Sequence, residues 1–143
     1  MKKIICIFVP ILIIAALITI VGYANLSSPL MQNKAQIKKE NVQVREYVLS
    51  ILPLGTDMDT AQQIITNHPI WEIDLVSEDR GYGIGTDSRP SGYEKVMVGE
   101  KSIQIHLGEY KGILMTTGVL AFLGFDENGK LIDVAVRKDI DSL

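Results

Sequence analysis

An uncharged, strongly apolar run near the amino terminus constrains this chain more than any other feature. The run begins at Ile4, ends at Val21 and follows Lys2 and Lys3, and no charged residue occurs between Lys3 and Lys34. A membrane-spanning helix needs roughly 20 apolar residues, whereas the apolar part of a cleaved signal peptide needs about 7 to 15. The 18 residues of the run lie between these lengths, so they predict either a transmembrane anchor or a signal peptide.

Cleavage and retention of this run predict different products. Gly22 and Ala24 place small residues at the two positions that a signal peptidase reads, so cleavage after Ala24 would give a secreted protein. Retention is favoured by the ten Leu and Ile residues of the run, each of which stabilises an inserted helix by about 0.3 to 0.6 kcal/mol. We expect a single-pass anchor in the cell membrane, with both lysines inside and the carboxy-terminal domain outside.

The rest of the chain has the composition of one small acidic domain. Without Lys2 and Lys3, 12 basic residues remain against all 17 acidic residues, a formal charge of −5. Nucleic-acid binding requires clustered Lys and Arg, so no nucleic-acid partner is expected. The single cysteine, Cys6, excludes an intrachain disulfide and a cysteine-based metal site. We expect residues 1–24 to form the signal-anchor segment, 25–33 a linker and 34–143 an extracytoplasmic domain.

Two helices are predicted after the linker. From residue 34 to residue 52, large apolar residues recur at helical spacing, at Ile37, Val44, Val48 and Ile51. Thr56 and Asp59 then resemble a capping box, and a second helix is expected to continue through Ile65. Asp57 and Asp59 fall in the first turn of that helix, where a carboxylate is stabilised by the helix dipole.

The sequence from Trp71 onward predicts antiparallel strands. Alternation places three side chains on the buried face of the first strand: Trp71, Ile73 and Leu75. A two-residue turn at Gly99 and Glu100 would pair Val96 with Ile103. A type I′ turn at Asn128 and Gly129 would form three further pairs: Phe125 with Ile132, Leu123 with Val134, and Ala121 with Val136. The expected fold is therefore α+β, with two N-terminal helices on one face of an antiparallel sheet of about four strands, preceded by the transmembrane or signal helix.

No catalytic residue, cofactor or metal ion is expected. The glycines of residues 81–85 do not lead into a helix whose amino end could hold a phosphate, so no nucleotide site is predicted. His68 and His106 are the only histidines, and they have no convergent third ligand in the sequence pattern. Ser102 would lie about 13 Å from His106 along one strand, which is too far for a nucleophile and its base.

The second face of the sheet is the candidate binding surface. Most of its predicted residues are polar, but it also carries aromatic, Met and Leu side chains, which are typical of a contact patch. The possible protein-binding face consists of Tyr93, Met97, His106, Leu120 and Phe122. The alternative is that residues 109–118 or 77–92 fold back over these side chains.

Two segments carry a resemblance to a known family. They read LGTDMDTA at residues 54–61, with NHP at 67–69, and FDENGKL at 125–131. The first is similar to the helix of SmpA/OmlA-type outer-membrane assembly lipoprotein domains and of relatives of the β-lactamase inhibitory protein, and the second is similar to their final hairpin. The resemblance implies a two-helix, four-strand domain that binds other proteins and catalyses nothing. No cysteine follows the apolar run, so a helix anchor would replace the lipid.

The sequence thus predicts a membrane-tethered extracytoplasmic module of the bacterial cell envelope that binds or assembles other proteins without being an enzyme. Its membrane contact would be the run from Ile4 to Val21, and its protein partner is not specified by the sequence. Two alternatives are a secreted, inhibitor-like binding protein and a small cell-envelope enzyme whose site assembles from scattered residues.

Overall fold

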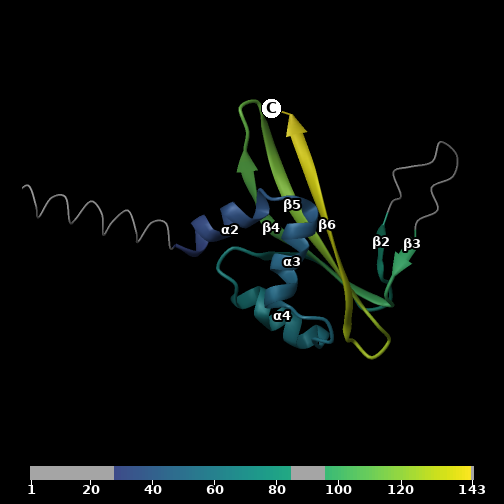
Figure 1. Ribbon diagram of the computed structural model, residues 1–143. Coiled ribbons are helices and arrows are strands. Elements are labelled where there is room, and N and C mark those ends of the chain that lie inside the picture. Colours follow the sequence, from purple (N-terminus) through teal and green to yellow (C-terminus); the bar gives the residue numbers. More distant parts are fainter. Residues whose placement is uncertain (1–27, 85–95, 143) are drawn as a thin grey trace, which may run out of the picture. The chain divides into compact units, whose positions relative to one another are not determined.

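The computed structural model describes residues 28–84 and 96–142 (Figure 1). The chain divides into two units, Met1–Gln32 and Asn33–Leu143, and the second contains almost all of the described residues. No helix within 28–84 or 96–142 is long and apolar enough to cross a membrane. The predicted anchor, the cleavage position after Ala24 and the first part of the predicted linker lie outside the described residues.

The predicted helix from residue 34 to residue 52 is in fact two helices. They are α2 (Pro29–Ile37), which begins inside the predicted linker, and α3 (Asn41–Ile51). The break allows buried residues of both helices to face one core, and it is stabilised by a lysine from the last strand. Lys138 Nζ donates to the carbonyl oxygens of Lys38 and Lys39, which have no intrahelical donor at the end of a helix.

The third helix begins one residue later than the predicted cap at Thr56 implies, and it lacks the predicted capping box. It is α4 (Met58–Asn67), and no side chain caps its first turn. Asp57 instead forms an ion pair with Lys130, with Nζ and Oδ1 2.6 Å apart, and Thr56 Oγ1 donates to the Pro53 carbonyl oxygen. The ion pair joins the start of α4 to the turn before the last strand.

The α+β class and the antiparallel sheet are confirmed. The main sheet has the order β1-β4-β5-β6, formed by β1 (Glu72–Ser77), β4 (Lys101–Lys111), β5 (Met115–Phe125) and β6 (Leu131–Ser142). A separate two-stranded sheet is formed by β2 (Tyr82–Ile84) and β3 (Val96–Val98). Buried residues of the helices share one core with Ile103, Ile105, Ala121 and Leu123. We call the opposite side of the main sheet its outer face.

The predicted final hairpin is confirmed in its strands and wrong at its turn. Leu123 pairs with Val134 and Ala121 with Val136, but Phe125 pairs with Leu131. Ile132 is an extra residue in β6, and this bulge shifts the register by one. Gly129 has a φ of +75° while no other residue type within the described ranges has a positive φ, so the turn is not type I′. A type I turn closed by a left-handed glycine explains the φ of Gly129 and the pairing of Phe125 with Leu131, and the bulge at Ile132 then restores the predicted register.

The predicted hairpin at Gly99 and Glu100 is wrong. Val98 pairs with Tyr82 and Val96 with Ile84, so β3 belongs to the small sheet and does not pair with β4. Glu100 donates its backbone N–H to the Phe125 carbonyl oxygen, which makes residues 99–100 a corner between the two sheets.

The predicted core face of the first strand is also partly wrong. A register shift between Ile73 and Leu75 inserts one residue into β1. Leu75 is consequently 59% exposed, whereas Val76 packs against the core. A bulge therefore exchanges the two faces within a single strand.

The last strand has its free edge covered by α3. Asn41 Nδ2 donates to the Val136 carbonyl oxygen at 3.3 Å, and Arg45 Nε donates to the Val134 carbonyl oxygen at 2.8 Å. These bonds satisfy backbone acceptors that an edge strand would otherwise expose.

Candidate functional site

The structure brings some of the predicted binding residues together. His106 and Leu120 are directly paired across β4 and β5, and Phe122 is paired with Gln104; all four side chains are half-buried. Met97 lies on β3 and is exposed. Tyr93 lies outside the described residues.

Met97 and Phe122 line a groove on the outer face, whereas His106 and Leu120 do not. The groove has a volume of about 300 Å³ and lies where β2 and β3 meet the main sheet. Its lining includes apolar, aromatic and polar side chains: Leu75, Tyr82, Met97, Gln104, Phe122 and Arg137. We call it the outer groove.

Two glycines allow the small sheet to lie against the main sheet. A β-carbon at Gly124 would lie 2.8 Å from Cε1 of Tyr82, and one at Gly81 would lie 2.1 Å from the Gly99 carbonyl oxygen. Neither position has room for a side chain. The Tyr82 ring is thereby placed beside Phe122, with ring centroids 6.0 Å apart. Tyr82, which belongs to the 77–92 segment, therefore lies against part of Phe122, while residues 85–92 lie outside the described residues.

A chain of hydrogen bonds through Asp133 to Arg45 holds the Tyr82 hydroxyl in place. Its hydroxyl donates to Asp133 Oδ2 at 3.0 Å, and Asp133 Oδ1 accepts from Arg45 Nη2 at 2.7 Å. Burial by itself would raise the pKa of the Asp133 carboxyl, but hydrogen bonds from Arg45, the Val134 N–H and Tyr82 outweigh burial and lower that pKa. Burial and the neighbouring carboxylate raise the pKa of the Tyr82 hydroxyl. Asp133 is therefore an anion that joins α3 to β2 through β6.

Two polar side chains at the rim of the outer groove, Arg137 and Gln104, already form hydrogen bonds to carboxylates. The Arg137 guanidinium lies 5.2 Å from the centroid of the Phe122 ring and forms two bonds of 2.7 and 2.8 Å to the Asp139 carboxylate. Gln104 Nε2 donates to Asp74 Oδ2 at 3.3 Å. Both side chains are at the surface, so they remain within reach of a bound molecule.

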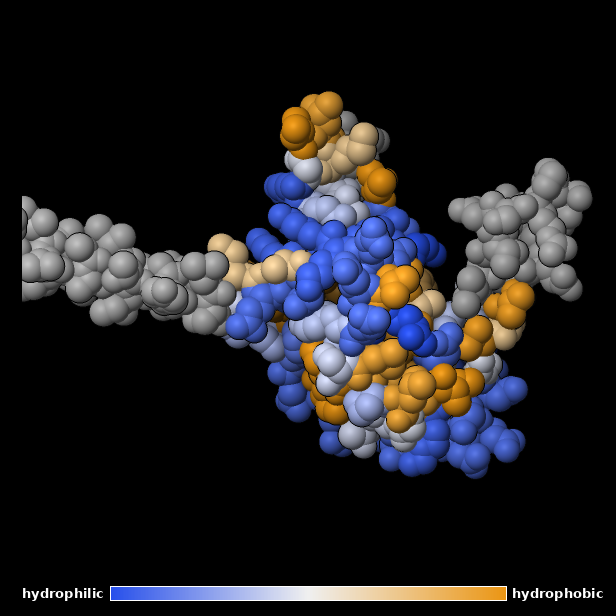
Figure 2. Space-filling view, viewed as in Figure 1, coloured by the Kyte–Doolittle hydropathy of each residue, from blue (hydrophilic) through white to orange (hydrophobic). Residues whose placement is uncertain are grey.

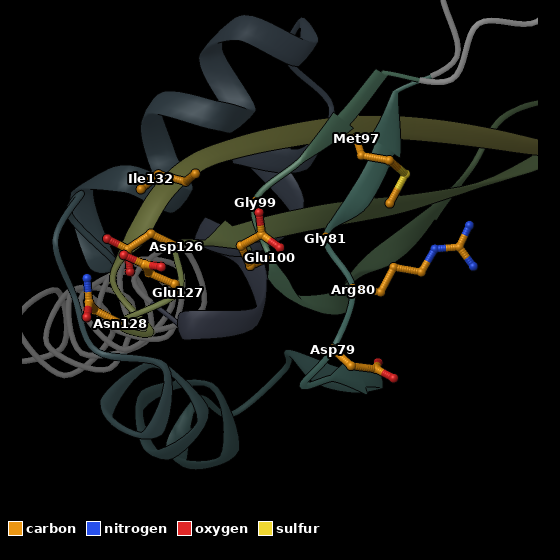
Figure 3. Close-up of a pocket in the computed structure, with 10 residues that line it drawn as sticks. All are labelled: Asp79, Arg80, Gly81, Met97, Gly99, Glu100, Asp126, Glu127, Asn128 and Ile132. Atoms are coloured by element: carbon orange, nitrogen blue, oxygen red, sulfur yellow. The ribbon is translucent and has the colours of Figure 1, made fainter.

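A second cavity adjoins the outer groove and shares Arg80, Gly81 and Met97 with it. Its volume is about 660 Å³. Figure 3 shows the turn between β5 and β6 with Asp126, Glu127 and Asn128, the nearby Glu100, and an Arg80 side chain that points away from them. Asp126 Oδ1 accepts the Lys130 N–H at 2.8 Å, so this carboxylate stabilises the turn. Within the described residues, no three His, Cys, Asp or Glu side chains could hold a metal ion.

The histidine and serine considered in the sequence have structural contacts. His68 Nδ1 accepts the backbone N–H groups of Trp71 at 3.2 Å and Ile70 at 3.4 Å, and its ring stacks on the Trp71 indole. Burial lowers the pKa of the His68 imidazole. Ser102 Oγ donates to the Arg80 carbonyl oxygen at 2.8 Å, which helps to hold the segment before β2.

Two features of the structure differ from what the sequence predicts. Asn33, placed in the predicted linker, is 1% exposed and hydrogen-bonded to Leu107 on β4, to Tyr47 on α3 and to Trp71 just before β1. Residues 109–118 do not cover the outer face but form the projecting ends of β4 and β5, with Ile113 and Leu114 exposed at the turn. Three consecutive large apolar residues after Gly112 were the available signal for an exposed apolar turn.

Comparison of the chain with protein-family models, with curated proteins and with solved structures finds no match. The resemblance to SmpA/OmlA-type domains and to β-lactamase-inhibitory-protein relatives stays a prediction.

Proposed function

We propose that this protein is a membrane-tethered, extracytoplasmic module that binds another protein, or assembles with one, through the outer groove and acts without catalysis. The run from Ile4 to Val21 would supply the tether. The observation that carries the proposal is the lining of the outer groove.

The groove combines the residue types that dominate protein interfaces. Tyr82 and Phe122 provide aromatic surface, Met97 provides a deformable apolar side chain, and Arg137 lies at the rim. Aromatic residues, Met and Arg are enriched where proteins bind one another, and a few such anchors supply most of the affinity. The glycine contacts and the bond from Tyr82 to Asp133 hold the aromatic residues in place before a partner arrives. Such preorganisation lowers the entropic cost of binding.

Site-specific photo-crosslinking in intact membranes tests the groove. A photoreactive residue is introduced at Gln104 in the full chain, and a matched one at Gln63, which is exposed on α4. We expect a discrete protein adduct from position 104 and none from position 63. Met97→Glu should abolish the adduct because it puts a charge into the groove, whereas Leu54→Glu, at another exposed apolar site, should leave it unchanged. Equal adducts at both positions would remove the groove from the proposal.

Amino-terminal sequencing tests the tether separately. A retained anchor gives a mature protein that starts at or near Met1, and protease added to intact cells then removes the domain. A protein that starts at Asn25 is instead the secreted, inhibitor-like alternative, in which the same groove would bind a partner in solution.

A further inference from the structure

The hairpin that joins β4 to β5 ends in an exposed apolar tip. The turn is closed by a 2.7 Å hydrogen bond from the Gly112 N–H to the Met115 carbonyl oxygen. Ile113 is 100% exposed, Leu114 73% and Met115 48%. Ile140, which pairs with Thr117 on the neighbouring strand, is 64% exposed. Figure 2 shows an apolar patch at the end of this hairpin, apart from the larger apolar surface of the domain.

Lysines lie behind this tip, around a tyrosine. Lys38 Nζ is 5.9 Å and Lys138 Nζ 5.8 Å from the centroid of the Tyr110 ring. Lys111 follows Tyr110 directly and is exposed. The nearby Asp139 carboxylate is bound by Arg137. We call Lys38, Lys111 and Lys138 the lysine collar.

We propose that the tip inserts into the surface of a lipid bilayer, with Ile113 and Leu114 among the acyl chains and the lysine collar at anionic headgroups. The inference rests on the proposed tether, which would hold the domain near a membrane. It adds a second membrane contact that the tether does not require.

The shape and charge of the tip favour lipid over a protein. Aliphatic residues at the end of a narrow hairpin form a protrusion, whereas a stable protein interface buries roughly 800 Å² of each partner over a broad surface. Lysine stems and tyrosine rings suit the boundary between acyl chains and headgroups, where the apolar part is buried and the polar end stays in water. A small apolar insertion binds a membrane only weakly and reversibly, so it becomes effective when a second attachment keeps it close.

Fluorescence of the full-length protein in vesicles tests the insertion. Cys6→Ser removes the native thiol, and Leu114→Cys is labelled with an environment-sensitive fluorophore. Glu127→Cys, in the turn at the opposite end of β5, is the matched control. We expect the label at position 114 to emit at shorter wavelength and to be quenched by nitroxide-labelled lipids, while the label at position 127 behaves as in water.

Vesicle composition tests the collar. Insertion should strengthen when anionic lipid is added, and Lys38→Gln and Lys111→Gln should each weaken that gain by about fivefold. Lys101→Gln, at the other end of β4, should leave the gain unchanged.

The outcomes separate this proposal from its alternatives and from the tether. A wavelength shift without lipid quenching would mean that a second copy or another protein covers the tip, and it would overturn the proposal. Identical spectra at positions 114 and 127 would also overturn it. Failure of the tether would appear instead as release of the protein from vesicles in an alkaline wash.

Discussion

The ring of Tyr82 occupies the space where any other residue at position 124 would place its side chain: a β-carbon on Gly124 would lie 2.8 Å from Tyr82 Cε1 and 3.1 Å from the Val98 carbonyl oxygen. The contact joins the small sheet to the outer face of the large one. The shape of the outer groove therefore depends on the absence of a side chain at position 124, as it does at position 81.

Gly124→Ala should push β2 and β3 away from the main sheet. We expect a loss of about 1 to 3 kcal/mol in the free energy of unfolding, because backbone and ring must both move. Denaturant unfolding of the full-length protein in detergent measures it. Gly118→Ala is the control on the same strand, since its nearest contact would be His106 Nε2 at 3.8 Å. Equal stability of the two variants would contradict the close packing.

Tyr82→Phe should remove the hydroxyl that donates to Asp133 and keep the ring in place. A hydrogen bond to a charged group contributes about 1.5 to 3 kcal/mol, so a loss in this range is expected. Tyr110→Phe is the control, because the contacts of Tyr110 with Lys38 and Lys138 are made through its ring. In the background of Asp133→Asn, the effect of Tyr82→Phe should shrink; an unchanged effect would mean that the two groups do not interact.

Phe122→Ser should have an effect between those of a surface and a core substitution. The ring is half-buried between Tyr82 and Arg137. We expect the free energy of unfolding to fall by about 2 kcal/mol, roughly half the cost of truncating a fully buried Phe. The photo-crosslinked adduct at position 104 should also be lost. A loss of stability with the adduct retained would show that the ring supports the fold and does not anchor a partner.

Asn33→Ala should be among the most damaging single changes in the domain. The Asn33 amide donates to the Leu107 carbonyl oxygen at 2.7 Å and accepts from Trp71 Nε1 at 3.2 Å and the Tyr47 hydroxyl at 3.3 Å. Its loss leaves buried polar groups unpaired, which costs about 1 to 3 kcal/mol for each group. Denaturant unfolding measures the loss of stability, and the near-UV circular dichroism of Trp71, the only tryptophan, reports the change in its packing. Lys34→Ala, at the exposed neighbouring residue, should leave the free energy of unfolding nearly unchanged.

Stability should fall as pH drops below about 6.5, the usual pKa of a histidine in an unfolded chain. Burial lowers the pKa of His68 in the folded protein, so the unfolded chain binds the proton first. The free energy of unfolding continues to fall until the pH reaches the pKa of His68 in the folded protein, and it recovers as the pH rises again. His68→Asn retains an acceptor for the Trp71 N–H but does not titrate. Its melting temperature should therefore change less between pH 7 and pH 5 than that of the unchanged protein, measured in parallel.

Much of the secondary structure could be predicted, because periodicity reports which side of an element is buried. The register of Leu123 with Val134 follows from alternation and a turn signal near Asn128 and Gly129. The bulge at Ile132 could not be predicted, since Leu131 and Ile132 are both large and aliphatic and either could face the core. The same ambiguity at Leu75 and Val76 conceals the bulge in β1.

The outer groove depends on contacts that local patterns do not encode. Pairing of β2 with β3 was hidden because the strand containing Tyr82 is three residues long and lies among glycines. Gly81 and Gly124 were the physical signal, because a glycine within or beside a strand often marks a close approach of another backbone or ring. The break after α2 had no such signal: Lys38, Lys39 and Glu40 include neither Gly nor Pro.

The packing of α3 along the edge of β6 has a consequence for how the domain acquires its structure. The hydrogen bond between Asn41 and Val136 joins residues 95 positions apart, and the one between Arg45 and Val134 joins residues 89 apart. During synthesis from the amino end, α3 cannot dock until nearly the whole domain has been made, because β6 is the last strand. Chains with such distant contacts fold slowly and expose apolar surface in the meantime. We therefore expect folding to complete late and cooperatively, once β6 has emerged.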